Sequence, residues 1–264
     1  MSDEIKETIE PETIQTETED EESYGMISKI IGVFIEPSKA FKHIAKKPEI
    51  WGPILTAFIL MLIVSFFTFD KMLEITLAQS AEQTESMDLP DEQIELGEKI
   101  VVITTRLLPL LQVMQFAVIW LIIGGVAYFI GLFMGQDSSY KSSLAVVAYA
   151  SLPAIVIKQV VISTIVLLVG NFSVGSEYAM AMAKSGLSLY SLFGNANMNE
   201  YLQSALMSFD VFIIWSLFLM AVGFKYANNV RMSYAWRTSI IVTLVVFVAS
   251  IFLVASSLKT MAGA

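Results

Sequence analysis

Five apolar stretches, each long enough to cross a lipid bilayer, constrain this chain more than any other feature. They run from Trp51 to Phe69, Leu107 to Met134, Leu144 to Val169, Met207 to Phe224 and Thr238 to Leu258. A helix of about 20 residues covers the roughly 30 Å hydrocarbon core. Because backbone polar groups find no water there, each stretch must satisfy them as a helix. The sequence therefore predicts an all-α membrane bundle with five transmembrane helices over residues 51–258.

The composition agrees with a membrane protein and sets an acidic tail apart from the rest. Charged residues make up 16% of the 264 residues, against roughly 25% in soluble domains. Residues 1–22 hold ten acidic residues and one lysine, which leaves 15 acidic and 15 basic residues in the remainder. Because residues 1–23 contain few apolar groups, we predict a disordered acidic cytosolic tail there. The apolar stretches indicate the lipid bilayer as a partner, and we expect no nucleic acid.

Residues 24–50 are predicted to form an amphipathic segment between the tail and the first span. Pro37 separates two short helical patterns, each with apolar residues at helical spacing. The second pattern carries lysines opposite its apolar face, namely Lys39, Lys42, Lys46 and Lys47. A basic amphipathic helix suits the headgroup region of a membrane. The alternative is that this segment packs on the protein's own cytosolic surface.

Basic residues near the span ends predict the orientation. On the side of the N-terminus lie Lys39, Lys42, Lys46, Lys47, Lys141, Lys225, Arg231 and Arg237, and on the other side lie Lys71, Lys99, Arg106, Lys184 and Lys259. The excess favours a multi-pass protein of the cell membrane with a cytosolic N-terminus and an external C-terminus. The acidic segment from Asp70 to Arg106 is then external, and we expect helix from about Glu92 straight into the second span.

The chain carries no recognisable catalytic apparatus. It has no cysteine, and its one histidine, His43, precedes the first span. A nucleophilic serine in the membrane would therefore lack a histidine base. The spans contain no paired carboxylates, zinc-protease signature or phosphate-binding loop. We predict a protein that is not an enzyme and has no metal or cofactor.

Three residues are predicted to shape helix packing. Gly131 and Gly135 form a Gly-x-x-x-Gly pattern near the inner end of the second span, and such small residues let helices approach closely in lipid. Packing within the bundle is the favoured interpretation, and the alternative is a homo-oligomer interface. Pro153 is expected to interrupt the third span.

Two ionisable residues, Lys158 and Asp210, lie inside the predicted third and fourth spans. Charges are costly in the bilayer and therefore mark either function or a buried pair. Counted from the inner boundaries, both lie roughly 22 Å along antiparallel neighbouring helices, so we predict that they pair. A structural pair is the favoured interpretation. The alternative is a solute-transport site, which interrupted helices near the midplane favour.

Three motifs in order resemble the Yip1-domain family of multi-pass membrane proteins in its prokaryotic form. The first runs from Pro37 to Ala45 and is followed by Pro48, Trp51 and Pro53. The second joins Gly131–Gly135 to the segment from Tyr140 to Pro153, and the third consists of Asp210, Phe212, Trp215 and Gly223. The resemblance covers roughly residues 24–258. Lys158 departs from the pattern of many relatives.

The resemblance implies a five-span bundle with a cytosolic N-terminal segment and no catalytic residues. Eukaryotic members of the family are linked to vesicle trafficking and to small Rab-type GTPases, whereas prokaryotic members lack an established activity. We therefore expect a non-enzymatic protein that organises or recruits membrane or cytosolic proteins at a membrane. The alternative function is a small-solute transporter or a subunit of one.

Overall fold

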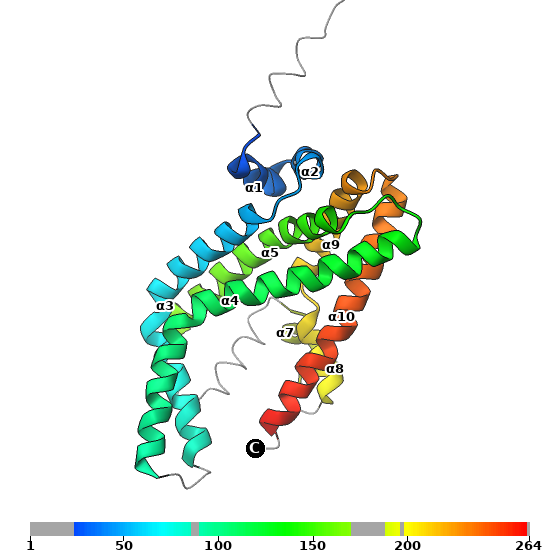
Figure 1. Cartoon of the computed structure of the whole chain (residues 1–264). Helices are drawn as coiled ribbons and strands as arrows, with labels where there is room; N and C mark the ends of the chain where they lie inside the picture. The colour runs from blue at the N-terminus through cyan, green and yellow to red at the C-terminus, as the bar shows by residue number, and fades with distance from the viewer. Residues whose placement is uncertain (1–23, 86–89, 170–187, 196–197, 263–264) are drawn as a thin grey trace, which may run out of the picture.

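A computed structural model describes residues 24–85, 90–169, 188–195 and 198–262, and these are almost entirely α-helical (Figure 1). The long helices are α3 (Trp51–Glu85), α4 (Asp91–Phe133), α5 (Tyr140–Val169), α9 (Val211–Ala227) and α10 (Met232–Ala262). The short helices are α1 (Met26–Ile35), α2 (Pro37–Lys46), α7 (Tyr190–Phe193) and α8 (Glu200–Ser208). The predicted all-α fold is confirmed. The predicted disordered tail, 1–23, lies outside the described residues.

Each predicted span falls on one long helix, with one correction. Among the described residues, α3, α4, α5 and α10 are long and apolar enough to cross a membrane. The fourth span is shorter than predicted, because Met207 and Ser208 belong to α8 and α9 begins only at Val211. With 17 residues, α9 is about 26 Å long at 1.5 Å per residue. It is therefore close to the thickness of the hydrocarbon core.

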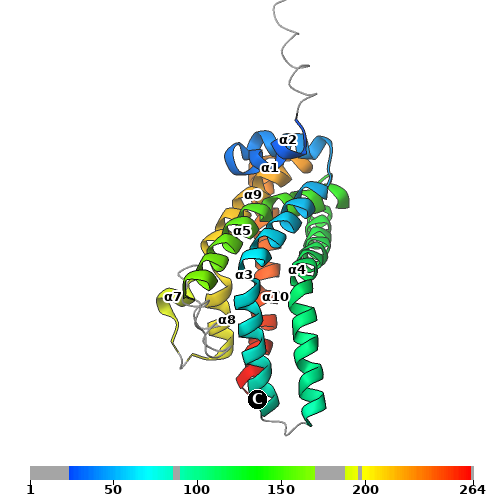
Figure 2. The same cartoon turned by 90° about the vertical axis from the view of Figure 1, so that its left-hand side faces the viewer.

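The helices form an elongated bundle whose two ends differ in structure. Helices α1 and α2 lie across one end, and the C-terminal end of α10 lies at the opposite end (Figures 1 and 2). Helices α3 and α4, with 35 and 43 residues, are about 52 and 64 Å long. They therefore continue as a hairpin past the length that a bilayer needs. The expected helix into the second span is present from Asp91, and α3 also continues past Phe69 to Glu85.

Helix α5 lies at the centre of the packing. All seven residues from Leu144 to Ala150 are buried, which explains why this stretch is apolar on every face. Two glycines let neighbouring helices approach it. A Cβ on Gly124 of α4 would lie 2.9 Å from Leu144 Cα, and one on Gly223 of α9 would lie 2.5 Å from Val146 Cγ1.

The structure corrects two of the packing predictions. Helix α5 continues through Pro153, which is buried inside it, so the proline does not interrupt the span. Gly135 lies beyond the end of α4 with φ +68°, where it ends the helix as a C-terminal cap. The Gln136 N–H donates to the Gly131 carbonyl (3.0 Å) and the Gly135 N–H to the Leu132 carbonyl (2.9 Å), as in a Schellman motif.

The other glycine of that pattern, Gly131, contacts the loop after α4 and not a neighbouring helix. A Cβ on Gly131 would lie 2.9 Å from Ser138 Cβ. The loop folds back over the end of α4, and Gly131 leaves the space for it. The Gly-x-x-x-Gly spacing therefore belongs to a helix end, whereas other glycines, such as Gly124, Gly223 and Gly52, lie at helix contacts.

Candidate functional site

Helix α2 is docked firmly on the end of the bundle. Its apolar face is buried through Ala40, Phe41 and Ile44, and Phe41 lies against Gly223 of α9, where an added Cβ would approach its ring to 3.1 Å. The four lysines of the segment remain exposed, namely Lys39, Lys42, Lys46 and Lys47. The bundle thus presents a basic surface above a buried apolar contact. We call α1 and α2 together the N-terminal platform.

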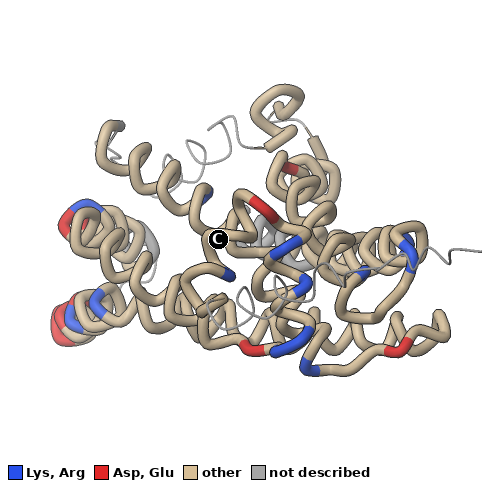
Figure 3. The backbone as a smooth tube through the Cα atoms, turned by 90° about the horizontal axis from the view of Figure 1, so that it is seen from above, with Lys and Arg blue, Asp and Glu red and all other residues tan. Residues whose placement is uncertain are grey.

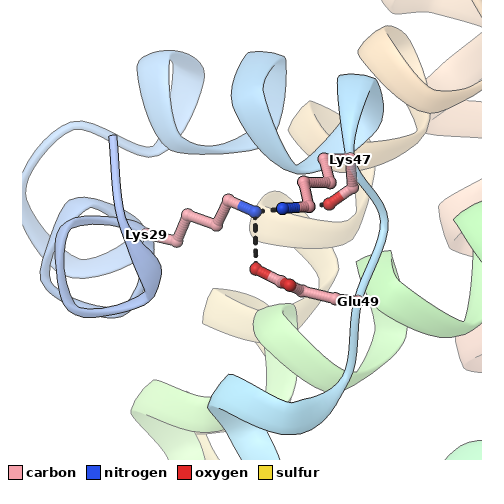
Figure 4. A network of polar contacts seen from close by, with 3 residues as sticks. All are labelled: Lys29, Lys47 and Glu49. Carbon is pink, nitrogen blue, oxygen red and sulfur yellow. Dashed lines mark hydrogen bonds and ion pairs between the residues drawn. The ribbon is translucent and has the colours of Figure 1, made fainter. Parts of the chain in front are cut away.

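An ion pair fastens α1 to the start of the first span. Lys29 Nζ lies 2.7 Å from Glu49 Oε1 and donates to the Lys47 carbonyl oxygen at 3.3 Å (Figure 4). The Lys29 side chain is only 4% exposed, so removing its partner would leave a nearly buried charge. Sequence reasoning missed this residue. The available signal was a single lysine within the otherwise apolar helix of residues 26–35.

The outward face of α1 is apolar. Ile27, Ile31 and Ile35 are exposed and recur every four residues, and Trp51 at the start of α3 is also exposed. Successive residues at this spacing form one stripe along a helix. Helix α2 therefore buries its apolar face against the protein, whereas α1 keeps an apolar stripe on the outside.

An aromatic contact joins Tyr24, which precedes α1, to His43 of α2. The rings of Tyr24 and His43 stack with centroids 4.0 Å apart, and Lys39 Nζ lies 5.8 Å from the centroid of the Tyr24 ring. Burial, and then the negative charge of Glu36, raise the pKa of Tyr24 above its ordinary value. Its hydroxyl is therefore protonated and neutral at physiological pH.

A buried polar cluster joins the two loops at the same end. Gln136 Nε2 donates to Thr238 Oγ1 and Asn228 Nδ2 donates to Gln136 Oε1, both at 2.7 Å. The three side chains are at most 7% exposed. Hydrogen bonds of this kind are directional, so they fix the α4–α5 loop against the α9–α10 loop. No residue spacing predicts this cluster, because Gln136 lies 92 and 102 residues before its two partners.

The structure brings the two intramembrane charges together. Lys158 Nζ, on α5, forms an ion pair with Asp210 Oδ2. Asp210 is not inside a helix as predicted, because it is the N-cap of α9 and its Oδ1 accepts from the Ile213 N–H at 2.9 Å. Its side chain is 6% exposed and that of Lys158 is 43% exposed. The Asp210 carboxylate therefore has two partners, whereas Lys158 is paired through its terminal amine.

The two charges lie at similar positions along their helices. Counted from the platform end, Lys158 is 18 residues into α5 and Asp210 lies 17 residues from the end of α9, or about 27 and 26 Å at 1.5 Å per residue. The depth of the pair in the membrane stays a prediction. A backbone hydrogen bond from the Leu189 N–H to the Phe209 carbonyl (2.9 Å) accompanies the break between α8 and α9.

Charged positions are sparse along the bundle, as the view from above illustrates, in which most of the tube is tan (Figure 3). Within the described ranges, no group of three or more His, Cys, Asp or Glu residues is placed to hold a metal ion. Gly131 and Gly135 lie at the end of α4, whereas Pro153 lies in α5 five residues before Lys158.

The long apolar helices, the glycine-mediated contacts and the two-helix platform define a polytopic α-helical membrane protein. The Yip1 domain family matches residues 31–256, and the chain belongs to this family. It is 26% identical over 248 residues to "Membrane protein YknW" of Bacillus subtilis (strain 168), which covers 89% of this chain and 93% of that protein. No solved structure matches the chain.

Proposed function

We propose that the protein organises or recruits partner proteins at a membrane through its N-terminal platform and catalyses no reaction. The observation that carries the proposal is the docking of α2, which buries Phe41 and Ile44 while its lysines remain exposed. A segment fastened in this way presents a fixed surface, and fixed surfaces bind with a smaller entropic cost than mobile ones.

The exposed lysines supply the chemistry of recognition. A surface carrying Lys39, Lys42, Lys46 and Lys47 attracts acidic partners and the anionic headgroups of a membrane. In this proposal the platform lies on the cytosolic side of the cell membrane, and the C-terminus lies outside. The excess of basic residues at the platform end and the opposite positions of α1 and the C-terminal end of α10 support that orientation (Figure 1).

Co-purification of the tagged full-length protein in mild detergent tests the proposal. Wild type is compared with Lys42→Glu on the platform and with Lys99→Glu on the distal part of α4. Lys99 is a matched control because it is also exposed and forms only an exposed i,i+4 pair with Glu95. We expect partners that Lys42→Glu loses and Lys99→Glu keeps. Identical sets of bound proteins for all three forms would refute recruitment by the platform.

A transport role is the second candidate, and the break between α8 and α9 beside Lys158 favours it. Transporter sites commonly use discontinuous helices, and Asp210 ends such a break with one carboxylate oxygen paired to the Lys158 amine. Solute flux that disappears in a Lys158→Met/Asp210→Asn variant with unchanged co-purification would select transport over recruitment.

A further inference from the structure

The bundle contains one apolar cavity that neither the platform nor the Lys158–Asp210 pair uses. It has a volume of about 270 Å³ and lies between α4, α5, α9 and α10. Its walls include the aromatic rings of Phe116 and Trp120, which stack with centroids 6.3 Å apart, and the side chains of Ile155, Met220 and Val246. Cavities of this kind bind apolar ligands when they are large enough.

The cavity lies midway along the spanning helices. Its lining residues are 7 to 15 residues from the start of α5 and 10 to 14 residues from the start of α10, which corresponds to depths of about 10 to 22 Å from the platform end. Bulk water does not reach this depth. Any occupant therefore comes from the hydrocarbon phase.

One side of the cavity reaches the outer surface of the bundle. Ile119 of α4 both lines the cavity and is 38% exposed. In a membrane this surface meets lipid, so a lipophilic molecule can enter sideways without crossing a polar barrier. Entry along the membrane plane also removes the need for an aqueous channel.

One fully buried polar atom in the wall lacks a partner. The Thr243 hydroxyl oxygen is buried and has no hydrogen-bond partner among the described residues, and Thr243 lines the cavity. The indole N–H of Trp120, by contrast, donates to Ser151 Oγ at 2.7 Å. An unpartnered buried hydroxyl destabilises the fold, so a ligand that hydrogen-bonds to Thr243 recovers this free energy.

The lining also restricts the charge of the ligand. No lysine, arginine, histidine, aspartate or glutamate is among the residues around the cavity, and an ion in such a place would be far too costly to desolvate. At about 30 Å³ per water-sized group, the volume holds roughly nine non-hydrogen atoms. We propose that this cavity binds a neutral, largely apolar molecule of that size whose single hydroxyl or carbonyl group hydrogen-bonds to Thr243.

Photolabelling with a diazirine derivative of octanol tests the site, using the full-length protein in lipid nanodiscs. Octanol has nine non-hydrogen atoms and one hydroxyl. We expect labelled peptides from α4 and α10 at the cavity wall, with labelling reduced by excess 1-octanol. Octanoate, which is charged, and nonane, which matches the size but lacks the hydroxyl, should compete at least fivefold less well.

Two variants and one control locate the label. Ala150→Phe fills the cavity from α5 and should abolish most labelling, whereas Val248→Phe on the exposed face of α10 should not. Thr243→Val keeps the shape and removes the hydroxyl, so the fold survives and octanol labelling should fall roughly two- to tenfold, the range of one hydrogen bond.

Two results would overturn the proposal. Equal competition by nonane, together with unchanged labelling of Thr243→Val, would mean that lipid tails alone fill the space. Labelling spread evenly over the lipid-facing helices of wild type and of the Val248→Phe control would mean that the probe reports lipid exposure and no site. The Thr243→Val measurement decides the outcome even if Ala150→Phe fails to fold.

Discussion

At the platform end, side chains from several helices interlock around Phe41, whereas at the far end α3 and α4 continue as a hairpin with exposed apolar side chains such as Leu96 and Ile100 (Figure 1). The platform end is also fixed by the Lys29–Glu49 pair and the Gln136 cluster. The ion pairs of the hairpin are exposed ones, Lys71–Glu74 and Lys99–Glu95. Buried contacts hold the platform end in one geometry, whereas exposed ion pairs contribute little to stability.

This difference indicates where a fixed interaction surface can be built. Tight packing makes a region intolerant of extra volume, and loose packing makes a region tolerant of it. Substitutions of the same kind at the two ends should therefore have unequal effects. Melting temperatures of the purified protein in one detergent provide a common measure for the comparisons below.

The largest effect is expected for Gly223→Leu. An added Cβ at Gly223 already lies 2.5 Å from Val146 Cγ1 and 3.1 Å from the Phe41 ring, so the larger side chain must separate α9 from α2 and α5. We expect a loss of about 3 kcal/mol in unfolding free energy. Gly97→Leu in the hairpin is the control, because nothing lies within 4 Å of its added Cβ. Equal losses at the two positions would remove the distinction between the ends.

Lys29→Met should have the next largest effect. The change keeps the aliphatic stem but removes the charged hydrogen bonds to Glu49 and to the Lys47 carbonyl. Hydrogen bonds to charged groups are worth about 1.5 to 3 kcal/mol, and the partial exposure of Glu49 places the loss near the lower value. Lys99→Met is the matched control in the hairpin, where the broken pair is exposed and the change should be small. A melting temperature unaffected by Lys29→Met would mean that α1 is not fastened by this pair.

Alanine substitutions at two adjacent glycines of α4 should change the melting temperature less, and each serves as the control for the other. The Cβ of Gly124→Ala would meet Leu144 Cα at 2.9 Å, whereas that of Gly125→Ala would meet only Tyr140 at 3.8 Å. Both changes gain helix propensity of up to about 1 kcal/mol. We therefore expect Gly125→Ala to raise the melting temperature and Gly124→Ala to lower it. The opposite order would contradict the close approach of α4 and α5.

The smallest effect is expected at the Lys158–Asp210 pair, because the Lys158 side chain is 43% exposed. Lys158→Met and Asp210→Asn should each lower the melting temperature slightly, and the double variant should recover most of the loss because neither charge is then left alone. Asparagine retains the N-cap contact to the Ile213 N–H, so the second change removes only the charge. Additive losses in the double variant would show that the charges do not interact.

The sequence predicted the fold well because lipid leaves few structures open to an apolar chain. Four of the five predicted stretches became a continuous helix, since no other element satisfies the backbone there. The partners Lys158 and Asp210 were also identified from residue type and depth alone. The position of Asp210 at a helix end was not predicted. The break before α9 is accompanied by a hydrogen bond from the Leu189 N–H to the carbonyl of Phe209, twenty positions later in the chain.

Residue spacing alone could not assign the roles of the glycines. Gly131 and Gly135 have the spacing of a packing motif, but Gly135 has a positive φ that no sequence pattern displays. The polar residues that follow, Gln136 to Ser139, are a usable signal for a helix end. The cavity around Thr243 could not be predicted, since it depends on how four helices cross and not on any local pattern.

Cysteine labelling of the platform tests the central claim most directly, because the wild-type chain contains no cysteine. Single variants Ile44→Cys, at a buried position, and Lys42→Cys, at an exposed position of the same helix, are treated with a water-soluble maleimide in permeabilised membranes. The account predicts rapid labelling of Lys42→Cys and slow labelling of Ile44→Cys until the protein is denatured. Equally rapid labelling of both variants before denaturation would contradict a platform docked on the bundle.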